Sequence, residues 1–397
     1  MTTSPDTLGP RRLSLAALFL KFLRFGFLAF GGPVAQIAMI RRTLVDEERW
    51  ISSPRFNRLL AVMQALPGPE AHELCVHMGM MARGRVGGLL AGLGFMLPGF
   101  VLMLAAAWLY ERFIVGQSGL TGLLLGVQIV VVAIIIRAVH RIGSHVLEDR
   151  LLWMLAIGAF VASLLHAPFW IPLVACGLIY ALEQRLWAGV AIAVAAVFIA
   201  ILFGVYLEVA PPAIAISAEP SPQLAALFIA GLKGGLLTFG GAYTAIPYVR
   251  ADTVGRGWLP DGVFLDGVAL AGVLPAPLVI FGTFTGYVVG GWAGALALTA
   301  GIFLPAFAFS MVLFNHLEAV VENPALHRLL AGVAAAVVGV IAATSLQLAW
   351  TTSQSAPSLW IGGLIFIAAL TAAWRLKPRW MPLLILGGAA AGSLALS

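Results

Sequence analysis

The stretch from Gly267 to Leu317 reads GVALAGVLPAPLVIFGTFTGYVVGGWAGALALTAGIFLPAFAFSMVLFNHL and contains no Asp, Glu, Lys or Arg. A helix that spans a membrane needs about 20 apolar residues, so this stretch is long enough to cross a bilayer twice. Charge-free stretches also run from Val86 to Tyr110, from Leu151 to Leu182 and from Leu329 to Trp374. Such runs are too long for the core of a globular domain and predict a membrane protein.

Composition supports the same class. Hydrophobic residues make up 61% of the 397 residues and charged residues 10%, whereas an ordinary soluble domain has about 25% charged residues. The apolar runs lack the alternating pattern of a membrane β-barrel, and a helix satisfies its own backbone hydrogen bonds in lipid. We therefore predict an all-α polytopic membrane protein with roughly 10 to 12 membrane segments.

The net charge of +6 does not indicate nucleic acid, because the basic residues lie in short segments between apolar runs, as the positive-inside rule predicts. The two cysteines, Cys75 and Cys176, are far apart in apolar sequence, so we expect neither a disulfide framework nor a cysteine-rich metal site. The polar start of the chain, which ends in Arg11 and Arg12, is expected to be retained rather than cleaved.

The chain repeats itself once. FLRFGFLAFGGP at 22–33 pairs with GLKGGLLTFGGA at 231–242, LPGP at 66–69 with LPAP at 274–277, and LPGF at 97–100 with LPAF at 304–307. Three motifs in the same order predict two homologous halves. We place the first repeat at residues 1–207, a polar, Pro-rich link at 208–223 and the second repeat at 224–397.

Loop charges predict that the two halves are inverted in the membrane. The segment from Arg41 to Arg58 has five Arg against three acidic residues, whereas its counterpart from Arg250 to Asp266 has two Arg against three Asp. The positive-inside rule then places the first segment in the cytoplasm and the second outside. This is the pattern of an inverted-topology repeat.

The duplicated Gly- and Pro-rich motifs predict broken helices. Two prolines one residue apart disrupt a helix, and glycines allow the backbone to approach a ligand closely. Breaks at equivalent positions of two halves point to a transporter's substrate site, although Gly and Pro also serve simple helix packing. The substrate-binding candidates in these motifs are Phe30, Gly31, Gly32, Pro33, Pro67, Gly68, Pro69, Gly240, Gly241, Pro275 and Pro277.

Two cations stand at equivalent positions of the repeat, Arg24 and Lys233, and each precedes sixteen uncharged residues. A charge at the centre of a bilayer costs at least about 3 kcal/mol, so such a residue is a functional candidate. Inverted halves could bring the pair together on one dianion, with help from positive helix ends. The alternative is that both side chains reach out to the lipid headgroups.

A titratable cluster follows the first proline motif, at Glu70, His72 and Glu73. Such groups beside a cavity can bind and release protons and so couple transport to a proton gradient. The second half has Leu278, Ile280 and Phe281 at these positions, so the coupling group would exist once. Alternatively, Glu70 only stabilises the start of a helix.

Motifs for other chemistry are missing from the sequence. His72 and His77 are five residues apart, which differs from the HExxH zinc motif, and there is no phosphate-binding loop or GxSxG elbow. We expect no enzymatic activity, no metal and no cofactor. A channel remains an alternative, but duplicated broken helices favour a carrier.

The motifs FGGP at 30–33, LPGPEAHEL at 66–74, GMMARGRVGG at 79–88 and LPGF, with FGGAYTAIP at 239–247 and GIFLP at 301–305, resemble the chromate ion transporter family in its long, two-domain form. The resemblance implies a secondary carrier in the bacterial inner membrane that exports chromate and confers chromate resistance. One departure is Ala276, which stands where the motif has Gly and argues against identical roles for the two halves.

Several alternatives stay open beside this resemblance. Sulfate or another tetrahedral dianion is the second candidate substrate, and a membrane receptor or assembly factor without transport is the candidate from another class. We expect the partners to be the oxyanion and membrane lipid, and we expect no nucleic acid partner. Assembly as a homodimer is left open.

Overall fold

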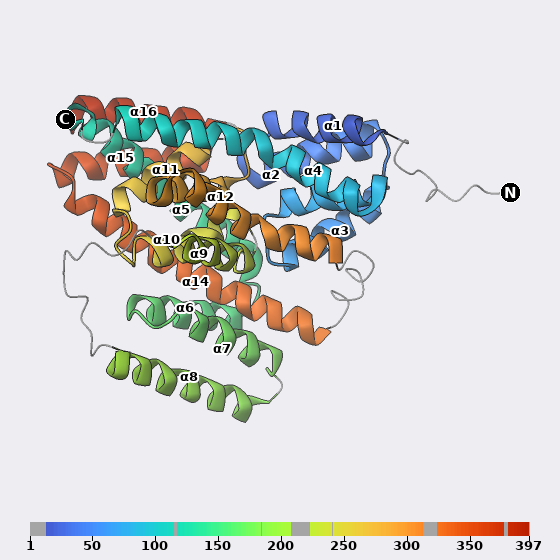
Figure 1. The fold of residues 1–397 in the computed structure, drawn as a ribbon. Coiled ribbons are helices and arrows are strands. Elements are labelled where there is room, and N and C mark those ends of the chain that lie inside the picture. The colour runs from blue at the N-terminus through green and yellow to red at the C-terminus, as the bar shows by residue number, and fades with distance from the viewer. Residues whose placement is uncertain are drawn as a thin grey trace.

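The computed structural model describes residues 13–114, 117–183, 185–207, 223–239, 241–312, 324–376 and 380–396. Within these ranges the regular structure is helical throughout, without a strand, and most helices lie side by side in one bundle (Figure 1). The predicted all-α class is therefore confirmed. Figure 1 also shows the first described helices, α1 to α3, at one end of the bundle.

The first half contains α1 (Leu15–Phe27), α2 (Gly32–Arg41), η2 (Arg42–Glu47), α3 (Ser53–Ala65), α4 (Glu70–Phe113), η3 (Ser118–Leu120), α5 (Thr121–Val146), α6 (Arg150–Leu164), α7 (Trp170–Ala181) and α8 (Leu186–Leu207). The second half contains α9 (Leu224–Leu236), η4 (Ala242–Ala245), α10 (Ile246–Thr253), α11 (Asp261–Val273), η5 (Leu278–Ile280), α12 (Phe281–Val312), α14 (Pro324–Gln354), α15 (Leu359–Arg375) and α16 (Met381–Ala395). The helices therefore follow one another in the same general order in both halves.

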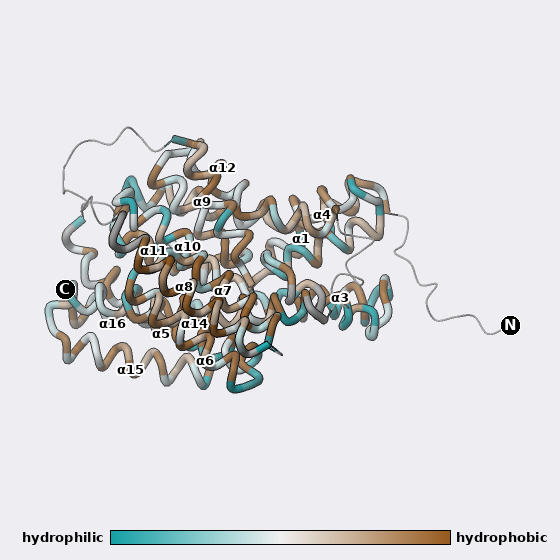
Figure 2. Tube along the Cα trace, turned by 90° about the horizontal axis from the view of Figure 1, so that it is seen from below, coloured by the Kyte–Doolittle hydropathy of each residue, from teal (hydrophilic) through white to brown (hydrophobic). Residues whose placement is uncertain are grey.

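Four of the described helical segments are long and apolar enough to cross a membrane, and six further apolar helices are shorter. Large apolar side chains cover their outer faces: Trp360 is 86% exposed and Leu394 87% exposed. Such surfaces are stable only against lipid. Hydrophilic residues gather instead at helix ends and connections, for example around α3 (Figure 2). The chain is a multi-pass membrane protein.

The long helices α4 and α12 each fold back on themselves. The backbone is non-helical at Arg83 (φ −146°, ψ 29°) and Gly84 (φ 60°, ψ −154°), and nearly the same angles recur at Gly290 and Gly291. A Cβ added to Gly79 would lie 2.3 Å from the carbonyl oxygen of Gly87, so the chain reverses and its two arms touch. The first arm of α4 is about 20 Å long, which is too short to cross a core of about 30 Å. The first arm alone therefore cannot span the membrane.

The two halves exchange helices at their interface. Helix α5 of the first half packs against α15 and α16 of the second, and α14 of the second packs against α6 and α7 of the first. One groove places Ile129 and Val132 of α5 beside Ala349 and Thr352 of α14, and another places residues 139–143 beside 338–342. These equivalent helices thus run antiparallel, as the predicted inverted repeat requires.

Glycines permit the close approach of the exchanged helices. A Cβ added to Gly126 of α5 would lie 2.1 Å from the carbonyl oxygen of Gly388 of α16, and a Cβ added to Gly332 of α14 would lie 2.3 Å from that of Cys176 of α7. Small residues at such crossings are typical of membrane helices, because close backbone packing replaces the hydrophobic drive that lipid removes.

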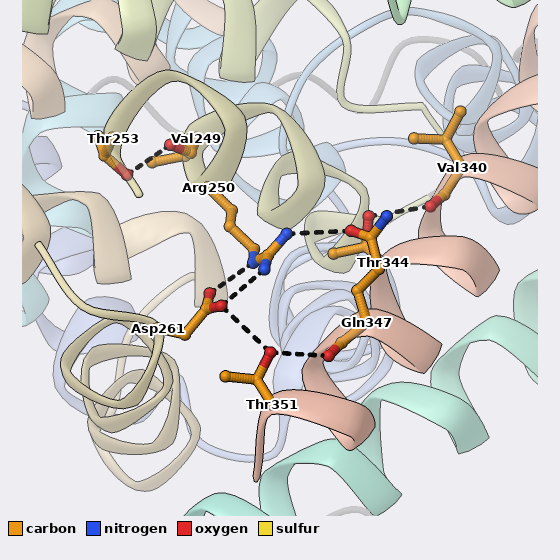
Figure 3. Close-up of polar contacts among 8 residues, drawn as sticks. All are labelled: Val249, Arg250, Thr253, Asp261, Val340, Thr344, Gln347 and Thr351. Carbon is orange, nitrogen blue, oxygen red and sulfur yellow. Dashed lines mark hydrogen bonds and ion pairs between the residues drawn. The ribbon is translucent and has the colours of Figure 1, made fainter. Parts of the chain in front are cut away.

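A polar network joins α10, α11 and α14 of the second half, and the first half has a weaker contact at the equivalent positions. Arg250 of α10 donates to both carboxylate oxygens of Asp261 on α11, at 2.6 and 2.7 Å, and to Gln347 of α14 at 3.1 Å (Figure 3). At the equivalent positions of the first half, Arg41 donates to the hydroxyl of Ser53 at 2.9 Å. A bidentate Arg–carboxylate pair is stronger and more specific than a bond to a neutral hydroxyl.

Candidate anion-binding cavity

A cavity lies where the broken segments of the two halves meet α5. It leaves about 60 Å³ for the centres of water-sized molecules, and one water needs about 10–15 Å³ by this measure. The cavity therefore has room for several water-sized groups. The polar and motif residues that line the cavity are Gly31, Gly32, Pro33, Arg137, Arg141, Tyr243, Gly272 and Ala276.

The start of α2 presents backbone donors at this cavity. Gly31 and Gly32 have φ of 87° and 77°, in the left-handed region that glycine tolerates best. Pro33 follows in the first turn of the helix, and no side chain caps its N-terminus. The first N–H groups of a helix lack partners within the helix and carry its positive partial charge, so they suit an anion.

Two arginines of α5 supply the charge. Arg137 and Arg141 are four residues apart, so both lie on one face of the helix, and both line the cavity. Among the described residues, Arg137 donates to the carbonyl of Leu376 at 3.5 Å and to the sulfur of Met381 at 3.9 Å. Among the described residues that line the cavity there is no carboxylate. The cavity is therefore strongly electropositive.

Hydrogen bonds between the halves fix the walls of the cavity. Gln36 of α2 donates to the carbonyls of Ala29 and Ala276, each at 2.9 Å. The amide of Gly68, in the proline motif of the first half, likewise donates to the carbonyl of Thr238 in the second half, at 2.8 Å. Each proline motif is thus held by the other half, which brings the FGGP motif of the first half to the PAP motif of the second.

A wider vestibule adjoins the cavity and shares Pro33 and Arg141 with it. It leaves about 400 Å³ for the centres of water-sized molecules. Its titratable and charged lining residues are Glu70, Arg141, His145, Glu148, Tyr180, His327 and Arg328. Glu148 follows the end of α5, and His327 lies near the start of α14. The vestibule therefore lies at one end of the antiparallel pair formed by α5 and α14. Arg141 stands between this space and the cavity.

The predicted titratable cluster divides into two environments. Glu70 lines the vestibule. His72 is fully buried, with ring centroids 4.9 Å from Phe303 and 4.7 Å from Phe307. Glu73 is also fully buried, against Gly68, and neither carboxylate oxygen has a hydrogen-bond partner among the described residues. Neither His72 nor Glu73 lines the cavity or the vestibule.

Ala276 has a physical reason to differ from the glycine of the first motif. A Cβ added to Gly99 of α4 would lie 2.4 Å from the Ala276 Cβ. The methyl group of the PAP motif therefore fills the space that the glycine of LPGF leaves. Packing between the halves accounts for this departure.

The other predicted site residues are spread over the fold. Pro67 and Gly68 are buried between the halves, as are Pro69, Pro275 and Pro277, whereas Phe30 is 47% exposed. Gly241 lines the vestibule, and Gly240 lies outside the described residues. Lys233 forms an ion pair with Asp252 at 3.0 Å, and Arg24 is exposed. Neither cation lines the cavity, and the converging-cation site stays a prediction.

Arg137 and Arg141 lie outside the repeated motifs and outside the titratable cluster that follows the first proline motif, so neither of these patterns indicates them. These arginines belong to α5 alone. The signal that could have found them is simple: they lie within a 26-residue apolar helix, and charges inside a membrane helix are functional candidates wherever they occur. Among the described residues, no group of three or more His, Cys, Asp or Glu could hold a metal ion.

Comparisons with known proteins agree with the repeat. The sequence pattern of the Chromate transporter family matches residues 16–181 and 225–393. The chain is 56% identical over 385 residues to a chromate transport protein of Pseudomonas aeruginosa, covering 96% of this chain and 92% of that protein. It is 30% identical over 391 residues to a chromate transport protein of Cupriavidus metallidurans, covering 96% and 93%. No solved structure matches the chain.

Proposed function

This chain belongs to the chromate transporter family, and we propose that it carries chromate out of the bacterial cytoplasm through the cavity between its two halves. Its place would be the inner membrane, and its activity would give resistance to chromate. The relatives named above as chromate transport proteins cover nearly the whole chain.

The observation that carries the proposal is the pairing of Arg137 and Arg141 with the glycine-led start of α2, in a cavity without a described carboxylate. Two arginines balance the charge of a dianion and offer planar arrays of N–H donors. The backbone donors of α2 then suit oxygens on another side of the ion. A neutral substrate would leave two half-buried guanidinium groups of the cavity without an anion between them, at a cost in free energy.

The membrane potential gives a direction for transport. With a negative interior, each charge is worth about 2.3 kcal/mol per 100 mV. A dianion that leaves the cytoplasm would gain about twice that amount, so uncoupled movement already favours export. We propose a secondary carrier on this basis, since the sequence contains no ATP-binding loop.

Sulfate is the second candidate substrate, because the same features recognise it. Arginines and helix N-termini bind oxygens and negative charge, which chromate and sulfate have in common. The lining side chains supply no group that would distinguish the central atoms. We therefore expect sulfate to compete with chromate.

The test is uptake of radiolabelled chromate into inverted membrane vesicles, with wild type, Arg137→Gln, Arg141→Gln and the matched control Arg112→Gln. Arg112 lies on an exposed end of α4. A charge-assisted hydrogen bond is worth about 1.5–3 kcal/mol, so each cavity variant should lose roughly 10- to 100-fold in transport while the control keeps its rate. Sulfate uptake alone would change the substrate, and no flux of either ion in wild type would favour the receptor alternative.

A further inference from the structure

Glu70 differs from the other acidic residues of the first half in its surroundings. It starts α4 directly after the proline motif, and its side chain lines the vestibule together with Arg141. Gln64 of α3 lines the vestibule beside it, and Arg141 is the cation that acts electrostatically on the Glu70 carboxylate. Because Arg141 also lines the cavity, one guanidinium faces both the carboxylate of the chain and the proposed substrate.

We propose that the Glu70 carboxylate is a tethered counter-anion of Arg141, which the transported oxyanion displaces and which takes up a proton when displaced. This inference rests on the proposed function, because it needs an anion in the cavity. A charged carboxylate and a dianion on the same arginine repel each other, and the repulsion is strong where water is scarce. Protonation of Glu70 removes the repulsion and frees Arg141 for the ion.

The other groups around Glu70 do not replace Arg141 in this role. Helix α5 adds His145, α14 adds His327 and Arg328, and Glu148 follows α5. These also line the vestibule, but none of them lines the cavity. Glu73 lies on the same arm of α4 and is sealed away from both spaces. Glu148 shares the vestibule with Arg141 as well, but its side chain is exposed, whereas Glu70 is buried. Glu70 is therefore the buried carboxylate beside the cation that lines both spaces.

Linkage fixes the sign of the pH effect. If anion binding and Glu70 protonation favour each other, each must strengthen the other by the same factor. Oxyanion affinity should then rise as the pH falls, by at most about tenfold per pH unit for one linked proton. A protein with a permanently neutral side chain at position 70, as in Glu70→Gln, should bind the anion tightly at every pH.

The experiment measures sulfate and chromate affinity of the purified full-length protein in detergent between pH 6 and about pH 9 by calorimetry, with proton uptake followed by a dye in weak buffer. Sulfate is the main probe because it stays a dianion over this range. The variants are Glu70→Gln, Glu70→Asp and Glu73→Gln. Glu111→Gln is the matched control, since Glu111 is exposed at the other end of α4.

We expect wild type and Glu111→Gln to bind more tightly as the pH falls and to take up a proton with sulfate. Glu70→Gln should bind at least about fivefold more tightly than wild type at high pH, without the proton uptake that wild type shows. Glu70→Asp should restore that uptake. The vestibule histidines are present in every variant, so the difference between wild type and Glu70→Gln belongs to Glu70.

Three other results would overturn the proposal. Equal pH dependence and equal proton uptake in wild type and Glu70→Gln would exclude the tethered anion while leaving the cavity intact. Loss of proton uptake in Glu73→Gln with uptake kept in Glu70→Gln would move the proton to Glu73. Absence of sulfate and chromate binding in wild type at every pH would instead remove the proposed function on which the inference rests.

Discussion

The first half of the molecule carries polar groups at positions where the second half is apolar. Glu70, His72 and Glu73 follow the first proline motif, whereas the equivalent arm of the second half begins with η5, whose Leu278 and Ile280 are buried. Conversely, the second half has the stronger frame. Its α10 and α11 are joined by a bidentate ion pair, and the matching contact of the first half is a single bond from an arginine to a serine.

This difference indicates that duplication supplied the geometry and that the two copies then diverged in their tasks. The kinks at Gly84 and Gly291 have nearly identical angles, so both copies kept the hairpin. Within the described part of the chain, it is the first copy that combines its hairpin with a titratable carboxylate beside a cavity. The second copy instead holds the bidentate ion pair between Arg250 and Asp261.

Breaking the frame of the second half should give the largest effect on stability. In Asp261→Asn, Arg250 loses its partner while its side chain stays only 18% exposed, and an unpaired buried charge costs about 3–5 kcal/mol. We expect a clear fall in unfolding free energy, measured by denaturation in mixed micelles. The matched change in the first half, Ser53→Ala, should cost about 1 kcal/mol. Equal losses in both variants would refute the unequal frame.

The contact between Gly99 and Ala276 can be tested by exchanging their sizes. Gly99→Ala forces two Cβ atoms to about the 2.4 Å that an added Cβ would have, and overpacking of this kind costs about 1–3 kcal/mol. Ala276→Gly should restore most of that loss in the double variant, as measured by Tm in detergent. If the double variant is no more stable than Gly99→Ala, the two residues do not compensate each other.

The fold was predictable from the sequence because its signals are local or repeated. Charge-free runs gave the membrane helices, and the matched motifs gave the two halves. The hairpins were harder to foresee, since Gly84 and Gly291 each sit in a stretch that reads as one continuous helix. A turn there becomes clear only from the contact between Gly79 and Gly87.

The site was predictable only in part. The FGGP motif reaches the cavity because broken helices tend to line cavities. The arginines of α5 could not be placed there from the repeat, because they lie outside the duplicated motifs and meet the FGGP motif only through tertiary packing. The separation of Glu70 from His72 and Glu73 likewise depends on which face of α4 meets α12, which spacing in one short segment does not determine.

Replacing His72 by the residue of the other half tests whether the cluster acts as a unit. In His72→Ile, which copies Ile280, a fully buried imidazole between Phe303 and Phe307 becomes an apolar side chain. We expect a gain in unfolding free energy of about 1 kcal/mol and unchanged sulfate affinity in calorimetry. Loss of proton uptake on anion binding would instead give His72 the coupling role that the sequence analysis considered.

The smallest effect on stability should come from the equivalent cations outside the cavity. Lys233 is 36% exposed and shares Asp252 with Arg256, so Lys233→Gln should cost less than about 1 kcal/mol. The double variant Arg24→Gln/Lys233→Gln should keep chromate flux in vesicles within about twofold, because neither side chain lines the cavity. Loss of flux in the double variant, with insertion into the membrane intact, would restore the converging-cation site. It would also show that the two halves have a second arrangement in which both cations contact the ion. Lys233 would have to leave Asp252 to reach the ion in that arrangement.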